Sequence, residues 1–374
     1  MQELIFTRET LHSLAELSGM EEKTSSKIVE ILSRYKPDKI FTFPESHTVL
    51  AEYSFSGDGP TLLFRADIDA IAVNEDPDMA YASRTKGVSH KCGHDGHTTI
   101  LLGLARQLYL EPLTKGRILL LFQAAEETGQ GARSLLDSRF LDSYRIDRIY
   151  ALHNIPGEPR NTILCREGGF SCSAISFDLF INGKITHAAE TASGLSPVDL
   201  TFEILQRIKE YDNTDICCDD YFLSTVIEIH LGEKAFGVAA GSGVIRMTFR
   251  AKNDHILQKT LRQIEKDINR IISQNDEIEF DIHWLEPFSA IENDPYAYSR
   301  IKEAALINGY PYKEIESPYR WGEDFGFLTQ KYPGAMFGLG AGTDCPALHD
   351  VNYDFPNEIL ETGIRMFYTL ASAN

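Results

Sequence analysis

The chain has 374 residues, of which 43% are hydrophobic and 24% charged, values close to globular averages, so disorder, collagen and coiled coil are excluded. Its 55 acidic residues outnumber 36 basic ones and give a net charge of −19, with no cluster of lysines or arginines that could follow a phosphate backbone. We therefore expect a small-molecule target, and neither a nucleic acid nor a membrane as partner.

The N-terminus and the cysteines predict a cytoplasmic protein. Apolar runs such as 118–122 fall far short of the ~18 residues that a membrane helix needs. Residues 1–4 carry an acid where a secretory signal would carry positive charge. The six cysteines lack the regular spacing of a disulfide framework, so reduced thiols are expected.

The first part of the chain reads as alternating helices and strands. Helical spacing over residues 7–35, broken at Ser18-Gly19, predicts a pair of helices. Two β-rich runs follow at 48–55 and 62–64, separated by turn residues at 56–60. The next predicted elements are a helix at 98–110, a strand at 118–122, a helix at 131–136 and a strand at 148–152. Such alternation, with nearly continuous apolar strands, predicts an α/β sheet covered on both faces.

The pattern changes near residue 172 and changes back near residue 288. The intervening elements are expected at 175–181, 197–208, 222–229, 244–249 and 255–272. These five elements follow the β-α-β-β-α-β order of a small α+β domain of the ferredoxin-like kind as far as its second helix. The α/β style resumes with elements at 297–307, 335–339 and 357–370. We therefore predict a larger α/β domain with a mixed sheet flanked by helices, residues 1–171 and 288–374, interrupted by the smaller domain at 172–287.

Residues 89–97 are the strongest candidate for a metal site. They pack three histidines, a cysteine and an aspartate into nine residues immediately before an apolar helix. Cysteine and histidine are preferred ligands of zinc-like cations, and the two glycines let the backbone fold tightly around an ion. A polar loop in which Asp95 caps the helix would explain one of these residues, not five.

Two pairs of acids follow predicted strands, at the sheet edge where open α/β folds place their ligands. Asp67 and Asp69 come directly after the strand at 62–64, where a turn or a helix cap is the ordinary explanation. Glu126 and Glu127 are adjacent at the end of a buried strand. One of these two side chains can ligate a metal while its neighbour, pointing elsewhere, moves protons.

Three further histidines complete the set of candidates. His153 ends another strand, and His349 lies in the segment 345–350; each by itself is more often a structural residue. Together with the cysteine and a carboxylate they exceed the three protein ligands of a single catalytic zinc, so two metals and hydrolysis of an amide or ester are expected. His187, at 183–189, is either a solvent-facing turn residue or a donor to the oxyanion from the inserted domain.

These motifs, in this order along the whole chain, resemble the two-metal amidohydrolases of the aminoacylase and carboxypeptidase group. The resemblance is greatest to the branch of auxin-conjugate amidohydrolases, hippurate hydrolases and N-acyl-amino-acid deacylases. The segments that carry it are 65–70, 90–97, Glu126-Glu127, 152–154, 183–189, 322–325, Leu348-His349 and 353–355.

The resemblance implies that a metal-activated water cleaves the amide of an N-acyl amino acid, with Glu126 as general base and acid. The implied ligands of two divalent ions, zinc or manganese, are Cys92, His94, Glu127, His153 and His349. Cys92 would bridge the ions as a thiolate, and Asp69 would orient a ligand. The inserted domain would be a lid that supplies His187 to the reaction and Arg250 to the substrate. We also expect a homodimer formed through the lid domain.

The sequence departs from the family pattern at several positions. Ala72 and Ala124 replace prolines, which are details of the backbone. After His187 the usual proline and second histidine are absent, and residues 190–192 read Glu-Thr-Ala. Gly237 stands where an asparagine normally lies near the substrate carboxylate. Recognition of a substrate carboxylate is therefore the least determined part of the function.

Two alternatives stay open. A dipeptidase or aminopeptidase on the same scaffold would need an acidic or carbonyl group to hold a free substrate amine. A catalytically inactive relative would bind a metal or ligand without turnover. Glu126 argues against the inactive relative, because a pure binding protein needs no carboxylate beside its metal ligand.

Overall fold

The computed structural model describes residues 1–76, 78–274 and 277–373, and the chain divides into two compact units. The first unit comprises Met1–Phe170, Ile291–Glu316 and Glu323–Asn374, and the second comprises Ser171–Ala290 and Ser317–Gly322. The second unit extends beyond the predicted 172–287. Phe288 still pairs with Ala174 in its sheet, and the carbonyl of Tyr319 accepts the N–H of Cys172 at 2.9 Å, so both flanking segments belong to it.

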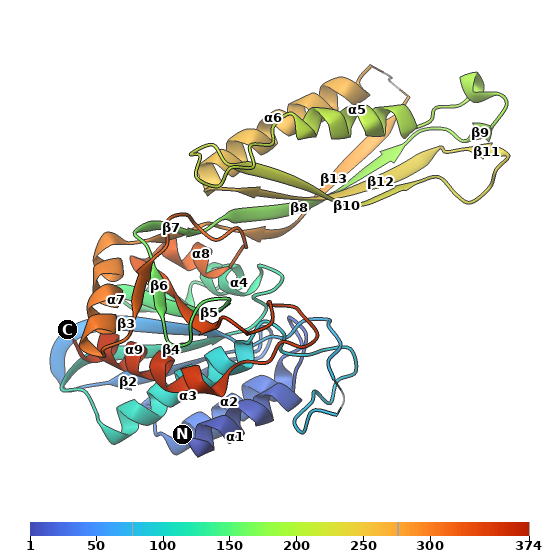
Figure 1. The fold of residues 1–374 in the computed structure, drawn as a ribbon. Coiled ribbons are helices and arrows are strands. Elements are labelled where there is room, and N and C mark those ends of the chain that lie inside the picture. Colours follow the sequence, from blue (N-terminus) through green and yellow to red (C-terminus); the bar gives the residue numbers. More distant parts are fainter. Residues whose placement is uncertain (77, 275–276, 374) are drawn as a thin grey trace. The chain divides into compact units, whose positions relative to one another are not determined.

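An eight-stranded mixed sheet forms the centre of the first unit (Figure 1). Its strands, in spatial order, are β1 (Lys39–Phe43), β2 (Thr48–Ser54), β4 (Lys115–Gln123), β3 (Gly57–Asp67), β5 (Arg148–Pro156), β16 (Gly334–Gly342), β6 (Ile163–Cys165) and β15 (Tyr312–Glu314). The four strands from β4 to β16 are parallel, whereas β1, β2 and β6 pair antiparallel with neighbours. The predicted mixed sheet is therefore confirmed.

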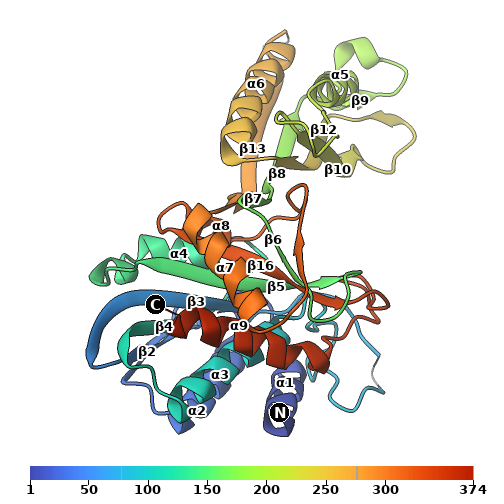
Figure 2. The ribbon, with the colours of Figure 1, turned by 60° about the vertical axis from the view of Figure 1, so that its left-hand side comes forward.

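Helices cover both faces of this sheet, as its nearly continuous apolar strands require. The helices are α1 (Gln2–Ser13), α2 (Glu22–Arg34), α3 (His94–Leu110), α4 (Gly131–Asp137), α7 (Pro295–Ile307), α8 (Phe325–Thr329) and α9 (Leu360–Ser372), with short 3-10 turns at Phe140–Ser143 and Asn357–Ile359. Helices α1, α2, α3, α7 and α9 share one large apolar cluster with the sheet. Helices α4 and α8 lie on the opposite face from α1, α2 and α3 (Figures 1 and 2).

The prediction of a turn at 56–60 is wrong for residues 57–60, which belong to a strand. Strand β3 begins at Gly57, which pairs with Lys115 at the start of β4. The register of this pair shifts between Gly57 and Thr61, so Asp58-Gly59-Pro60 is accommodated as an irregularity within the strand. Pairing with a strand distant in sequence outweighs local turn chemistry here.

The second unit is a four-stranded antiparallel sheet with two helices. Its main elements are β8 (Ser173–Asn182), α5 (Val198–Lys209), β10 (Phe222–Leu231), β12 (Ser242–Ala251), α6 (Asp254–Ile272) and β13 (Glu279–Phe288). The spatial order β10-β12-β8-β13 is that of the predicted ferredoxin-like domain, and both helices share one apolar cluster with the sheet. Small additions are β9 (Thr186–His187) paired with β11 (Val238–Ala239), and a 3-10 turn at Thr191–Ser193.

Strand β7 (Gly168–Ser171) pairs with β14 (Ile291–Asn293) where the chain passes between the two units. Among the helices that the structure describes, none combines the length and the apolar character needed to cross a membrane.

Candidate metal centre

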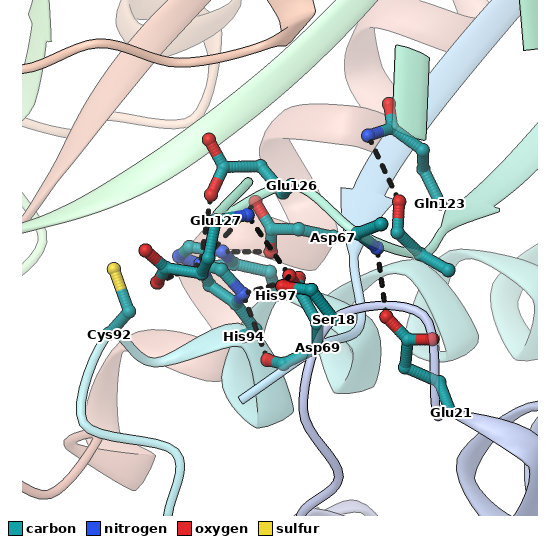
Figure 3. Close-up of polar contacts among 12 residues, drawn as sticks. Ser18, Glu21, Asp67, Asp69, Cys92, His94, His97, Gln123, Glu126 and Glu127 are labelled. Carbon is teal, nitrogen blue, oxygen red and sulfur yellow. Dashed lines mark hydrogen bonds and ion pairs between the residues drawn. The ribbon is translucent and has the colours of Figure 1, made fainter. Parts of the chain in front are cut away.

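The candidate centre lies where three parallel strands of the first unit end. Strand β3 is paired in parallel with β4 and with β5, and Asp67 at the end of β3 is in register with Gln123 at the end of β4. Because the carboxyl ends of parallel strands meet at one edge of a sheet, the polar residues that follow them gather there. Figure 3 shows the acidic side chains from the ends of β3 and β4 converging on histidines at the start of α3.

The turn before α3 brings Cys92 and His94 to this edge. Gly93 between them has φ +96°, in the left-handed region that glycine adopts without strain. A Cβ at Gly93 would lie 2.7 Å from Asn154 Oδ1 and 2.7 Å from the Tyr353 hydroxyl. Only glycine fits so close an approach, which explains the Cys-Gly-His sequence.

The structure brings the five predicted metal ligands together. Cys92 Sγ lies 3.6 Å from His153 Nε2, and Glu127 Oε1 lies 3.7 Å from His94 Nε2 and 3.9 Å from His349 Nε2. The ligand atoms of Cys92, His94 and His153 lie within 4.8 Å of one another, as do those of Cys92, Glu127 and His349. The Cys92 thiol belongs to both groups.

The donor atoms fit a soft or borderline divalent cation. His94 Nε2 and Glu127 Oε1 are buried and have no hydrogen-bond partner among the described residues. Buried polar atoms of this kind are costly unless they are satisfied, and coordination of a cation satisfies both. A thiol, three imidazoles and a carboxylate are the donors that zinc accepts, and manganese accepts the imidazoles and carboxylate.

Burial sets the protonation of these ligands. Burial and the neighbouring His97 lower the pKa of His153 to about 3, so its imidazole is neutral, the protonation state in which histidine ligates a metal. Burial raises the pKa of Glu127 to about 7, and burial together with the charge of Glu127 raises that of Cys92 well above its usual range. A bound cation favours the ionised form of both groups.

Asp69 orients His94. The ring Nδ1 of His94 lies 3.0 Å from the Asp69 carbonyl oxygen and 3.2 Å from its Oδ1, which leaves Nε2 facing the other ligands. Burial by itself would raise the pKa of Asp69, but the hydrogen bond and charge of His94 lower it below its ordinary value. A carboxylate that holds the second nitrogen of a ligating histidine is the usual support of such a ligand.

Glu126 lies beside the ligands and is almost fully buried. Its Oε2 is 4.0 Å from His94 Nε2, and its Oε1 is 3.4 Å from the backbone nitrogen of Asp324. Burial, followed by the charges of Glu323 and Glu127, raises the pKa of Glu126 well above its usual range. A raised pKa makes a carboxyl group a stronger base toward a nearby proton donor.

Arg65 supplies the positive charge beneath these acids. Its Nη1 lies 2.8 Å from Asp67 Oδ2, and its Nη2 lies 3.0 Å from Glu323 Oε1 and 2.7 Å from Asp324 Oδ1. All four side chains are buried. This network joins the end of β3 to the segment before α8, more than 250 residues away, and surrounds Glu126 with fixed charges.

Sequence reasoning did not assign a role to Asp67, His97 or Asn154. His97 Nδ1 lies 2.7 Å from Asp67 Oδ1, and His97 Nε2 lies 2.5 Å from Asn154 Oδ1. The ligand atoms of Asp67, His94 and His97 also lie within 4.8 Å of one another. Each of the three residues belongs to a motif that the sequence analysis quoted, so the motifs were the available signal.

His187 and Arg250 belong to the second unit. His187 is exposed on β9, and its Nδ1 accepts the N–H of Ala189 at 3.1 Å. Arg250 lies on β12, and its Nη1 donates to the Arg320 carbonyl at 3.1 Å. Among the described residues no carboxylate forms an ion pair with Arg250. The roles of His187 in the reaction and of Arg250 toward the substrate stay predictions.

Comparison with known sequences gives consistent matches over nearly the whole chain. The model of peptidase family M20/M25/M40 matches residues 63–373. The N-acetyldiaminopimelate deacetylase of Lactobacillus acidophilus is 30% identical over 97% of this chain and 95% of its own length. The N-acetylcysteine deacetylase of Bacillus subtilis is 29% identical over 98% of this chain and 96% of its own length.

Solved structures are similar over the same extent. The YXEP protein of Bacillus subtilis, a dinuclear metal binding peptidase from the M20 family, is 26% identical with a TM-score of 0.83, covering 100% of this chain and 97% of its own. A putative aminohydrolase from methicillin-resistant Staphylococcus aureus has a TM-score of 0.84 at 23% identity, covering 99% and 96%, which supports the fold alone.

We predict that Arg65→Met strongly destabilises the protein. The substitution leaves the buried carboxylates of Asp67, Glu323 and Asp324 without their counter-charge, and breaking a buried ion pair from one side costs about 3–5 kcal/mol. Urea unfolding measures the change. The matched control is Arg365→Met, which removes the exposed pair with Glu361 and should cost no more than about 1 kcal/mol. Equal effects of the two variants would contradict this role of Arg65.

Proposed function

The chain belongs to peptidase family M20/M25/M40, and on this premise we propose that it hydrolyses the amide bond of an N-acyl amino acid or a related small amide. The observation that carries the proposal is the pair of buried atoms, His94 Nε2 and Glu127 Oε1, that have no hydrogen bond among the described residues, with the carboxyl group of Glu126 beside them. The deacetylase names of the two relatives support the choice of an N-acyl amino acid as substrate.

The proposed cofactor is a pair of divalent ions, zinc or manganese. Cys92, His94, Glu127, His153 and His349 would hold them, with the Cys92 thiolate shared between the two groups of ligand atoms. When bound, such ions lower the pKa of water and polarise the carbonyl of an amide. The dinuclear site named for the YXEP protein supports this assignment.

Glu126 is the proposed general base and acid. It takes a proton from the attacking water as the oxygen bonds to the amide carbon, and it returns a proton to the nitrogen as the carbon–nitrogen bond breaks. Burial, followed by the charges of Glu323 and Glu127, raises the pKa of Glu126, which favours its uptake of a proton in the first step. Asp69 keeps His94 in the orientation that the ligands need.

Substrate recognition is assigned to the second unit. Arg250, which has no ion pair among the described residues, is available to a substrate carboxylate. Gly237 replaces the asparagine that the family pattern leads us to expect, and a Cβ at Gly237 would meet no atom within 4 Å. Packing therefore does not require glycine there, and we propose that the loss of the side chain changes which acyl amino acids are accepted.

The homodimer and the cytoplasmic location stay predictions. A dimer formed through the lid domain is supported by β10, the edge strand of the four-stranded sheet. The side chains of Val226, Ile227 and Ile229 on this strand are exposed. An apolar edge strand of this kind can pair with a second chain.

The direct test is a substrate panel of N-acyl amino acids and dipeptides given to the metal-loaded protein. We expect turnover of N-acyl amino acids, its loss on treatment with a chelator, and its recovery on addition of zinc or manganese. Cleavage of dipeptides alone would favour an aminopeptidase. Undiminished activity in thoroughly demetallated protein would refute the proposal.

The two adjacent glutamates should respond differently to the same substitution. Glu126→Gln keeps the shape of the side chain but removes the proton carrier, so kcat should fall by about 10²- to 10⁴-fold while the metal content is unchanged. Glu127→Gln exchanges an anionic ligand for a neutral one, so metal content should fall. Elemental analysis and steady-state kinetics distinguish the two, and the reverse pattern would show that the roles are exchanged.

His187→Ala tests the role proposed for the second unit. A donor to the oxyanion acts mainly in the transition state, so its removal should lower kcat by about 10²- to 10³-fold with little change in KM. Both metals should be retained. A kcat within about threefold of the parent would show that His187 is only a turn residue, since an oxyanion donor contributes far more than that.

A further inference from the structure

The turn at residues 18–21, between α1 and α2, contacts the backbone before Glu126 directly and the backbone after it through Asp69. The hydroxyl of Ser18 donates to Asp69 Oδ2 at 2.7 Å, and the same oxygen accepts the N–H of Glu127 at 3.0 Å. Glu21 Oε1 accepts the N–H of Ala125 at 2.8 Å. Figure 3 shows Ser18 and Glu21 approaching the acidic site from the N-terminal part of the chain. Both residues precede residue 63, where the match to the family model begins.

The backbone at Ala125 needs this support. Its φ of +55° lies in the left-handed region, which costs a residue with a Cβ roughly 1–2 kcal/mol. Such a conformation persists only where the surroundings impose it. The Ala125 carbonyl accepts the N–H of Gly131 at 3.0 Å, and the Ala125 N–H is held by Glu21. Since Glu126 follows directly, a rotation at Ala125 would redirect the Glu126 carboxyl group.

Burial of the Glu21 side chain is unfavourable for the stability of the fold. The side chain is fully buried, and its Oε2 has no hydrogen-bond partner among the described residues. Burial, with a smaller contribution from the charge of Asp69, raises the pKa of Glu21 to about 7. A buried carboxyl group with an unsatisfied oxygen disfavours folding, so capping a helix does not by itself account for it.

Glu21 does not cap the helix that it precedes. It occupies the N-cap position of α2, where a side chain normally accepts hydrogen bonds from the first turn, but it makes no such bond. Glu16 does this instead: its Oε2 accepts the N–H groups of Lys23 and Thr24, each at 2.9 Å. Glu16 therefore serves α2, whereas Glu21 Oε1 accepts the N–H of Ala125 at 2.8 Å and, within its own turn, the N–H of Gly19 at 2.9 Å.

We infer that Glu21 is a positioning residue for Glu126: its carboxyl group holds the Ala125 N–H and thereby fixes the direction of the Glu126 side chain. The consequence for catalysis rests on the proposed function, but the contact itself does not. Misplacing a reacting group by about 1 Å can cost on the order of 10²-fold in rate, so loss of this hydrogen bond should reduce kcat without removing any group that touches the substrate.

The kinetic test compares Glu21→Met with Glu16→Met. Both variants exchange a buried glutamate of the same segment for an apolar side chain of similar length. For Glu21→Met we expect kcat to fall by about 10²-fold, with KM within about threefold and unchanged metal content. Glu16→Met should lose stability, because a helix cap is removed, and keep its kcat. Glu21→Gln retains an oxygen acceptor for the Ala125 N–H and should recover most of the rate.

Hydrogen exchange gives a readout that does not depend on activity. In the peptide that contains Ala125, exchange should be faster in Glu21→Met than in the parent, because the N–H has lost its acceptor. It should be unchanged in Glu16→Met. If Glu21→Met fails to fold, Glu21→Ala replaces it, since the space left behind admits water to the Ala125 N–H without supplying a fixed acceptor.

Each outcome of these experiments either supports or overturns the inference about Glu21. An active parent whose Glu21→Met variant keeps kcat within about threefold would overturn the inference, because loss of positioning costs far more. Equal loss of kcat in Glu16→Met, or unaltered exchange at Ala125, would overturn it as well. A parent that is inactive on every amide, but shows the expected exchange pattern, would count against the proposed function and leave the positioning contact established.

Discussion

The guanidinium of Arg65 is a fixed cation that holds the buried carboxylates of Asp67, Glu323 and Asp324 together at the candidate centre. Its charge does not balance theirs. Even beside Arg65, burial keeps the pKa of Asp324 raised to about 7. Glu126 and Glu127 add two further acids at the same sheet edge. The site therefore carries an excess of acids over fixed cations, and divalent ions are the ligands that such an excess suits.

A second buried network joins α1 to the helix that carries the histidines. Asp95, the residue after His94, lies 2.9 Å from Arg8 Nη1 and 2.9 Å from His12 Nδ1, and both partners are on α1. Burial opposes a charge on His12, but hydrogen bonds to Asp95 and Glu75 raise its pKa to about 9. Helix α1 is thus held to the first turn of α3 by ionic contacts. Together with Ser18 and Glu21, it makes the N-terminal segment part of the support of the site.

The proposed function assigns different roles to the two units. The proposed ligands, the proposed general base and their supports all belong to the first unit, where most of these side chains are buried, whereas His349 is exposed and Glu127 is partly exposed. The residues assigned to the substrate belong to the second unit, where His187 is exposed and nothing packs where a Cβ at Gly237 would lie. Few contacts constrain such positions, so they can change between relatives without loss of the fold.

The sequence by itself determined the parts that depend on local pattern. Apolar periodicity located the long helices and strands, and the spacing in residues 89–97 pointed to the metal ligands. Apolar periodicity did not reveal strands such as β6 and β15, because they are too short to show a pattern. Only the tertiary structure brought Arg65 to Asp324 and Glu21 to Ala125, because these contacts join residues 259 and 104 positions apart. The order of the strands in the sheet and the burial of the side chains determine which residues meet in these contacts. No local stretch of sequence encodes either of them.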